Sequence, residues 1–319
     1  MTSILVTGGA GFIGSHTVQA LLDRGDTVIC LDNFNDYYSP QRKYQNAALS
    51  LGRPGYTLIE GDVRDQDALQ ALFEAHRPQR IVHIAAMAGV RYSIEHPHLY
   101  ESVNVGGTLN ILEMARRYNV ENVVFASTSS IYGARQAIPF NEADRVDWPV
   151  SPYAATKRAA ELLGYTYHHL YGLNFTALRF FTVYGPRGRP DMAPYLFTEA
   201  VFKGTDLKMF GDGSSSRDYT YIDDIVQGVL AAVDRPLGYE IINLGNNRTI
   251  CLRDFIALVE RLVGKKARVV QVPMPPGDVP RTCADIGKAQ RLLDYNPQTP
   301  FETGLARFVD WYRAEVAAQ

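Results

Sequence analysis

Short apolar runs alternate with amphipathic stretches through roughly the first 180 residues of the chain. The runs are continuous and rich in β-branched residues, a pattern typical of parallel strands that are buried on both faces. The stretches between them, such as Phe12–Arg24, place apolar residues at helical spacing. This alternation predicts an α/β fold with a doubly wound parallel sheet. The expected strands are Ser3–Thr7, Thr27–Leu31, Tyr56–Glu60, Arg80–Ile84, Asn122–Ala126 and Phe175–Phe180.

The pattern changes near Thr182. The stretch TVYGPRGRPDMAP, residues 182–194, contains three prolines and two glycines and predicts a loop. We expect residues 1–181 to form a dinucleotide-binding domain, and residues 182–319 to form mainly a smaller α/β substrate lobe. The prediction leaves open whether the chain crosses between the two lobes. In the second part we expect helices at Tyr195–Lys203, Ile222–Val233 and Leu252–Leu262, strands at Leu207–Phe210 and Glu240–Leu244, and a helical C-terminal tail.

Composition and charge exclude several classes of protein. The 319 residues carry a net charge of -2, so the chain has no basic excess for binding nucleic acid. Three cysteines without CxxC spacing argue against a disulfide framework and favour a reducing compartment. No apolar run reaches the roughly 20 residues of a membrane span, and the first residues lack the basic segment of a secretory signal. We therefore expect a cytoplasmic protein without a membrane partner, and the seven histidines suggest no metal site.

A glycine-rich turn follows the first expected strand and opens the first expected helix. The stretch TGGAGFIG contains GxGxxG from Gly9 and GxxGxxG from Gly8. Such glycines form a tight turn and let a pyrophosphate approach backbone N–H groups at a helix N-terminus. Asp32 ends the second strand, 18 residues after Gly14, where a carboxylate binds the ribose of NAD and repels the 2′-phosphate of NADP. The sequence therefore predicts a Rossmann-type NAD site.

Asp62 follows the third expected strand and is a second candidate contact of the cofactor. At this edge of the sheet its side chain would face the adenine, with Val63 packed on the ring. The alternative is a residue that caps the next helix, and one side chain is able to do both.

Tyr153 and Lys157 are four residues apart on an expected helix, so both side chains lie on one face. A phenol titrates near 10 and is a poor base at neutral pH, but a nearby ammonium and a cationic nicotinamide would lower its pKa. The fifth strand ends in the hydroxyl residues Thr128, Ser129 and Ser130, where doubly wound folds bind ligands. We expect Thr128 or a neighbouring serine to share a proton with the substrate; the alternative is a turn that satisfies its own backbone.

These motifs together resemble the extended short-chain dehydrogenase/reductase family. The residues that carry the resemblance are TGGAGFIG, Asp32, the STSSIYG segment and YAATK. RDYTYIDDI and PPGDVPRTCAD in the second part resemble the nucleotide-sugar branch of that family. The resemblance covers nearly the whole chain. It implies catalytic roles for Thr128, Tyr153 and Lys157, contact of Arg217 with the UDP diphosphate, and contact of Asp278 with the uridine ribose.

The same resemblance separates two reactions of the branch. The 4,6-dehydratases carry Thr-Asp-Glu after the fifth strand, because β-elimination needs an acid and a base. Here Thr128 is followed by Ser129 and Ser130, so no carboxylate stands there. Oxidation and re-reduction at C4, which is epimerisation, is the reaction that remains.

Further segments, LDNFNDYY, AGVRYS and FFTVYGPRGRPDM, look like UDP-glucuronate 4-epimerases. In that family an arginine seven residues after a threonine binds the substrate carboxylate, and Thr182 and Arg189 match this pair. Planar guanidinium suits a carboxylate, so Arg189 is the expected selector, with Arg187 and Arg91 as further anionic contacts. Arg187 stands where many members have tryptophan, and FGDGSSSRDY looks more like epimerases of neutral UDP-hexoses. UDP-glucose, UDP-N-acetylglucosamine and UDP-xylose therefore remain alternative substrates.

Other classes of protein also remain open. A non-catalytic NAD-binding protein and a dehydrogenase with net redox turnover use the same fold. Family members pair through helices that correspond to Glu95–Arg117 and Tyr153–Tyr171, which implies a homodimer. The residues expected to line NAD are Gly8, Gly11, Phe12, Ile13, Gly14, Asp32, Asn33, Asp62, Val63, Ala85, Tyr153 and Lys157. Those expected to contact the UDP-sugar are Ser129, Ser130, Thr182, Arg187, Arg189, Arg91, Arg217 and Asp278.

Overall fold

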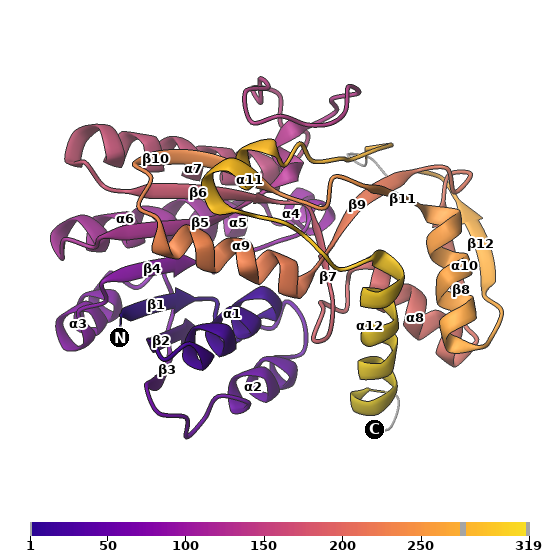
Figure 1. Cartoon of the computed structure of the whole chain (residues 1–319), viewed down its shortest axis with the longest axis horizontal. Helices are drawn as coiled ribbons and strands as arrows, with labels where there is room; N and C mark the ends of the chain where they lie inside the picture. Colours follow the sequence, from indigo (N-terminus) through magenta and orange to yellow (C-terminus); the bar gives the residue numbers. More distant parts are fainter. Residues whose placement is uncertain (1, 275–278, 317–319) are drawn as a thin grey trace.

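A seven-stranded parallel sheet forms the centre of the protein (Figure 1). The computed structural model describes residues 2–274 and 279–316. Strand order is β10-β6-β5-β4-β1-β2-β3, with every neighbouring pair parallel. This order confirms the doubly wound α/β prediction. The strands are β1 (Ser3–Thr7), β2 (Thr27–Asp32), β3 (Tyr56–Glu60), β4 (Arg80–His83), β5 (Asn122–Thr128), β6 (Phe175–Phe180) and β10 (Tyr239–Leu244).

Two hydrophobic clusters cover the two faces of this sheet. On β1, Ile4 and Val6 belong to one cluster and Leu5 to the other, because successive side chains point to opposite faces. The first cluster packs α1 (Phe12–Asp23) and α9 (Ile222–Asp234) on the sheet. The second packs the helices of the opposite face, which are α3 (Gln66–His76), α6 (Gly107–Arg117) and α7 (Pro152–Tyr171). Burial on both faces explains why the strands are continuous apolar runs.

The second lobe lies beyond the carboxyl ends of the strands (Figure 1). The cluster under α1 and α9 continues into it through Phe255, Phe301 and Tyr312, so the two lobes share one core. Two small sheets form the lobe, one ordered β11-β9-β7 and one that pairs β12 with β8. Its strands are β7 (Thr182–Tyr184), β8 (Asp206–Phe210), β9 (Ser216–Tyr221), β11 (Thr249–Cys251) and β12 (Arg268–Val272). Further helices of the second lobe are α8 (Ala193–Lys203), α10 (Leu252–Val263) and α12 (Phe301–Glu315). Helix α2 (Pro40–Ala48) belongs to the first lobe, and α11 (Gly287–Leu293) packs beside β10.

Strands β9, β11 and β12 were not expected from the sequence, and the structure differs from the expected elements at three further places. Residues 182–184, the first three of the expected loop, form strand β7, which pairs with β9. Strand β10 was expected among the smaller elements but is an edge strand of the large sheet, beside β6. The chain thus returns to the first lobe through α9. The single helix expected over Glu95–Arg117 is divided into α4 (Val90–Glu95), α5 (Pro97–Tyr100), a π-helical segment (Glu101–Gly106) and α6. Pro97 stands where α5 begins, since it has no N–H to continue α4.

Candidate active site

The glycine turn after β1 has the geometry that a dinucleotide needs. Gly8 has φ +70°, and a Cβ there would lie 2.7 Å from the backbone N of Ala85 at the end of β4. A Cβ on Gly14 would lie only 2.0 Å from the carbonyl O of Gly8. Helix α1 begins at Phe12, and its N-cap residue Gly11 has no side chain to cap it, so the first N–H groups of the helix are left for a ligand. A pyrophosphate fits this uncapped N-terminus.

Asp32 lies at the end of β2, directly beside this turn. Its Oδ2 accepts a hydrogen bond from the backbone N of Ala10 at 3.0 Å, and Oδ1 accepts one from Phe34 at 2.9 Å. Burial raises the pKa of this carboxyl above its usual range, against these two hydrogen bonds and the charge of Lys43. Each carboxylate oxygen has a further lone pair for a ribose hydroxyl. The residue type and position therefore fit NAD.

The remaining residues expected at the cofactor lie around the same edge of the sheet. The Asn33 side chain donates to Asp62 Oδ2 at 2.9 Å, so the ends of β2 and β3 are linked. Hydrogen bonds from Arg64 lower the pKa of Asp62 to about 2 and keep it ionised. Asp62 is not the N-terminal cap of α3, because Asp65 has that role. Three more of the expected residues are Phe12 and Val63, which are buried, and Ile13, which is half-buried.

Tyr153 and Thr128 are brought together from two elements. Ser151 caps the N-terminus of α7 by accepting from the backbone N of Ala154, which places Tyr153 in the first turn. Thr128 is the last residue of β5, and its hydroxyl hydrogen-bonds the Tyr153 phenol. Burial nevertheless raises the pKa of Tyr153, although the Thr128 hydrogen bond and the charge of Arg189 act in the opposite direction. Burial is the largest of these influences on the phenol. The expected lowering of its pKa depends on a cationic nicotinamide as well as on an ammonium, and it stays a prediction.

Lys157 lies one turn further along α7, facing β5. Its side chain is 2% exposed, and Nζ donates to the carbonyl O of Ala126 at 2.8 Å. Burial lowers the pKa of Lys157 to about 7, while Glu161 opposes this shift. The ammonium is thus held at the carbonyl of Ala126, and its charge is not among the main influences on the Tyr153 phenol.

The other expected hydroxyls lie at the ends of neighbouring strands. The Thr128 hydroxyl accepts a hydrogen bond from the Ser130 backbone N and donates to the Ser130 hydroxyl at 3.2 Å. Ser130 is therefore engaged in the local turn that we considered as the alternative role. Ser129 follows Thr128 in the 3-10 turn Ser129–Tyr132 and is half-buried. Thr182, also half-buried, begins β7.

Arg189, the arginine expected to select the substrate carboxylate, lies in the segment that follows β7. Its Nε and Nη2 form a bidentate ion pair with Asp191, at 3.0 and 2.6 Å. The Tyr37 phenol donates to the same carboxylate at 3.0 Å. The Arg189 side chain is only 20% exposed, and its charge lowers the pKa of Tyr153. A fixed cation thus stands close to the phenol.

The side chains of Arg187 and Arg91 do not join the Arg189 ion pair but contact other parts of the protein. Arg187 lies against α1, with Nη2 donating to Gln19 Oε1 at 2.8 Å and Nε 3.1 Å from His16 Nε2. Its placement does not support the expectation that it joins Arg189 at the substrate. The Arg91 guanidinium lies over the Phe210 ring at 4.6 Å, across to the second lobe.

One of the two expected UDP contacts, Arg217, lies in the second lobe. Arg217 is on β9, where its Nη1 donates to the carbonyl oxygens of Ser216 and Pro280. Asp278 lies outside the described residues.

Sequence reasoning missed a buried ion pair beneath the catalytic helix. Glu161 accepts from Arg179 of β6 with both carboxylate oxygens, at 2.9 Å each, and from the Ser127 hydroxyl at 2.7 Å. The spacing of four residues between Lys157 and Glu161 was the available signal for Glu161. Arg179 gave no such signal, because its partner lies 18 residues away.

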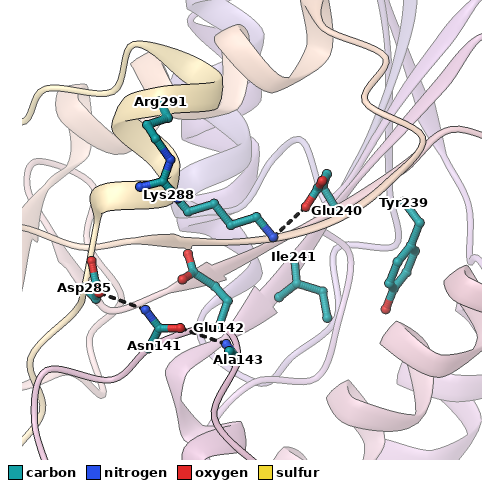
Figure 2. Close-up of a pocket in the computed structure, with 9 residues that line it drawn as sticks. All are labelled: Asn141, Glu142, Ala143, Tyr239, Glu240, Ile241, Asp285, Lys288 and Arg291. Atoms are coloured by element: carbon teal, nitrogen blue, oxygen red, sulfur yellow. Dashed lines mark hydrogen bonds and ion pairs between the residues drawn. The ribbon is translucent and has the colours of Figure 1, made fainter.

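A cavity of about 350 Å³ lies elsewhere, at the free edge of β10. Figure 2 shows Lys288 of α11 reaching Glu240 of β10, at 2.5 Å. Glu142 accepts from the backbone N of Asn243 at 2.8 Å and so satisfies the open edge of the sheet. None of the expected site residues borders this cavity. It is lined by Asn141, Glu142, Ala143, Tyr239, Glu240, Ile241, Asp285, Lys288 and Arg291.

Metal ligands and membrane-spanning helices were also considered as features of residues 2–274 and 279–316, the described part of the chain. Within these ranges, no three His, Cys, Asp or Glu side chains are grouped so that they could hold a metal ion. No helix there is both long and apolar enough to cross a membrane. His83 is buried, and its ring nitrogens lie 2.7 Å from the Thr7 hydroxyl and 3.0 Å from the Thr108 hydroxyl.

Comparison with known proteins agrees with this site. Residues 4–245 match the NAD dependent epimerase/dehydratase family. A UDP-glucuronate 4-epimerase of Thermodesulfobacterium geofontis is 46% identical over 313 residues, which cover 98% of this chain and 96% of the relative. The structure of UDP-glucuronic acid 4-epimerase from Bacillus cereus, in complex with UDP-glucuronic acid and NAD, is 35% identical with a TM-score of 0.91, covering 97% of this chain and 98% of that one. The UDP-glucose 4-epimerase of Thermotoga maritima, with UDP-glucose, is 34% identical with a TM-score of 0.90 and the same coverage. The chain belongs to the NAD-dependent epimerase/dehydratase family, as the resemblance of its motifs predicted.

Proposed function

We propose that this protein is a UDP-glucuronate 4-epimerase, which interconverts UDP-glucuronate and UDP-galacturonate. The observation that carries the proposal is the fixed guanidinium of Arg189 within electrostatic reach of Tyr153. A cation placed there suits a substrate that bears a carboxylate one carbon away from the reacting C4. The 46% identity to a UDP-glucuronate 4-epimerase over nearly the whole chain supports the same substrate.

NAD, when bound, supplies the hydride acceptor for C4 and then the hydride donor, so turnover needs no net oxidant. The glycine turn at Gly8–Gly14 would hold its pyrophosphate and Asp32 its ribose. Lys157, buried beside β5, would hold the second ribose. We propose that residues 1–181 bind the cofactor and that most of residues 182–319 bind the nucleotide-sugar.

Tyr153 is the group proposed to move the proton of the C4 hydroxyl. The hydrogen bond with Thr128 and the charge of Arg189 both favour its phenolate, which is the form that accepts a proton. Thr128 also bridges to Ser130, so its hydroxyl is oriented by the turn. The same phenol returns the proton when the 4-keto sugar is reduced on its other face.

Two features favour epimerisation over the alternatives. Ser129 and Ser130 provide no carboxylate for β-elimination. The 4-keto form of a glucuronate is a β-keto acid, which loses carbon dioxide when its carboxylate aligns with the carbonyl. Contacts of the carboxylate with Arg189, Thr182 and Ser129 would hold it out of that alignment.

A neutral UDP-sugar is the second candidate substrate. The similarity to a UDP-glucose 4-epimerase at a TM-score of 0.90 favours it, and so does the fact that Arg189 already has a carboxylate partner in Asp191. Both candidates use the same residues for proton transfer and differ only in what Arg189 contacts.

One experiment separates these candidates. Purified protein is mixed with UDP-glucuronate, UDP-glucose or UDP-N-acetylglucosamine without added cofactor, and the configuration at C4 is followed by proton NMR. Conversion of the glucuronate alone is expected. Conversion of only a neutral sugar would leave the mechanism intact and remove Arg189 as the selector. Absence of any conversion, even with added NAD, would contradict the epimerase proposal.

We further propose a cytoplasmic homodimer. Adjacent helices α6 and α7 expose large apolar side chains, including Leu109, Leu162, Tyr165 and Leu170, which are 38% to 60% exposed in the single chain. Pairing of these helices with a second copy would bury them. A monomeric mass in solution would contradict the dimer. Three free cysteines agree with a reducing compartment.

A further inference from the structure

The Arg189 guanidinium presents two different edges. Asp191 uses only one of them, the side formed by Nε and Nη2, at 3.0 and 2.6 Å. The end of the group that carries Nη1 is not part of this bidentate pair. A guanidinium has five N–H donors in a rigid fork, so one carboxylate on the side leaves the end able to receive another.

Tyr37 fixes this arrangement from a different part of the chain. Its phenol donates to Asp191 Oδ2 at 3.0 Å, and its ring lies 5.5 Å from the Arg189 guanidinium. The ring also packs edge-on against Tyr92 at 5.0 Å. The phenol oxygen would be only 2.7 Å from a Cβ on Gly89, so the absence of a side chain there lets Tyr37 reach the ion pair.

Arg189, which Asp191 and Tyr37 hold in place, is also close enough to the site to influence Tyr153. Arg189 follows Thr182 in the segment after β6, and its charge acts on the Tyr153 phenol. Its side chain is 20% exposed, so it lies mostly within the protein, whereas Asp191 is 38% exposed and lies on the outer side. Asp191 is thus the more exposed partner of this ion pair.

We propose that Asp191 and Tyr37 are positioning residues that hold the Nε and Nη2 side of the Arg189 guanidinium. The end of the group that carries Nη1 is then directed toward the carboxylate of an acidic hexose. This inference rests on the proposed function and deepens it by naming what sets the preference for the acid. A free arginine side chain must give up many rotamers to bind a carboxylate. Fixing it beforehand removes that cost from substrate binding.

Asp191 could instead compete with the substrate carboxylate for Arg189, and removing it would then change KM in the opposite direction. If its carboxylate occupied the place of the substrate carboxylate, it would compete with the acid, and removing it would improve binding. If it positions Arg189, removing it weakens binding of the acid. The sign of the change in KM therefore decides between the two.

The experiment compares Asp191→Ala, Tyr37→Phe and Arg189→Ala in the holoenzyme with UDP-glucuronate. For Asp191→Ala we expect KM to rise tenfold or more while kcat stays within about twofold, because an interaction shared by ground and transition states is lost. Tyr37→Phe keeps the ring and loses only the hydroxyl, so a smaller rise of about threefold is expected. Asp191→Glu should recover part of the loss. Unchanged affinity for UDP and unchanged retention of NAD show that the fold is intact.

Glu199→Ala is the matched control, since Glu199 forms an exposed ion pair with Lys203 on α8 and should leave KM unchanged. A KM that is unchanged or lowered in Asp191→Ala overturns the positioning role. Arg189→Ala distinguishes the carboxylate role of Arg189 from the positioning role of Asp191. If it raises KM for UDP-glucuronate and Asp191→Ala does not, only this inference fails; if it has no effect either, the carboxylate role in the proposed function fails as well.

Discussion

Glu161 and Arg179 form a bidentate ion pair that is closed to solvent, with 0% and 1% of the side chains exposed. Both contacts measure 2.9 Å, and Ser127 of β5 and Arg158 of α7 donate to the same carboxylate. The pair joins helix α7, which carries Tyr153 and Lys157, to the neighbouring strands β5 and β6. It lies one turn beyond Lys157, so it fixes the part of α7 that the site depends on.

Glu161→Gln should destabilise the protein strongly. Breaking a buried pair leaves the Arg179 guanidinium buried without a counter-charge, which costs about 3–5 kcal/mol. Urea unfolding followed by circular dichroism measures the loss.

A matched control separates this effect from ordinary surface charge. Glu302 pairs with Arg261, and both side chains are more than half exposed. Glu302→Gln should therefore cost less than about 1 kcal/mol. The double variant Glu161→Gln with Arg179→Met should recover stability relative to Glu161→Gln alone, because it also removes the uncompensated charge. Equal losses in Glu161→Gln and Glu302→Gln would contradict the structural role of the buried pair.

Tyr153→Phe should reduce turnover by about 10²–10⁴-fold, because positioned proton transfer contributes that much. The ring and its packing remain, so the unfolding midpoint should change little. Thr128→Val removes the hydroxyl that hydrogen-bonds the phenol and should have a smaller effect in the same direction. Initial rates of C4 inversion by NMR measure both variants.

Tyr165→Phe is the control for this pair, because Tyr165 is on the same helix but half exposed and remote from β5. It should retain full activity. Near-normal turnover in Tyr153→Phe would remove the proposed acid–base role, whatever the stability of the variant.

The sequence predicted the large sheet to within one or two residues at most strand ends. Strands such as β1 and β6 are buried on both faces, so nearly every residue along them is buried. Strand β7 was missed because only three residues are extended, among prolines and glycines. The place of β10 could not be read locally, since it depends on its pairing with β6, more than 60 residues earlier in the chain.

The sequence predicted those candidate site residues that belong to one motif and lie within a few positions of one another in the chain. The glycine turn, Tyr153 and Lys157 are of this kind. Arg179 became recognisable as the partner of Glu161 only through the register of β5 with β6, which places Ser127 beside Arg179. The raised pKa of Tyr153 depends on burial by other elements, which local spacing does not report.

Gly14→Ala should release the cofactor. A methyl group there would lie 2.0 Å from the carbonyl O of Gly8, so the turn must move away from the helix N-terminus. We expect the amount of NAD that copurifies with the protein to fall at least tenfold, measured from the supernatant of denatured protein. Gly106→Ala is the control, because nothing lies within 4 Å of its Cβ position. Full retention of NAD in Gly14→Ala would contradict a tight turn around the pyrophosphate.

His83 should make stability depend on pH below neutrality. Burial lowers its pKa to about 3, whereas in the unfolded chain it titrates near 6.5. Between these values the unfolded state binds a proton that the folded state does not, so stability rises with pH across this window. The stabilisation is fully present above about pH 6.5 and is lost as the pH falls toward 3, at about 1.4 kcal/mol per unit.

Replacing His83 by Gln removes the titration and isolates this contribution. At pH 7.5 the variant should be less stable than the unmodified protein, because the hydrogen bonds with Thr7 and Thr108 are disturbed. The difference should shrink as the pH falls from 6.5 to 4.5, since only the unmodified protein loses stability through His83. Other groups with shifted pKa values, such as His16 and Asp218, are present in both proteins and cancel in the difference. Urea unfolding at four pH values measures it, and a gap that stays constant with pH would show that His83 titrates alike in both states.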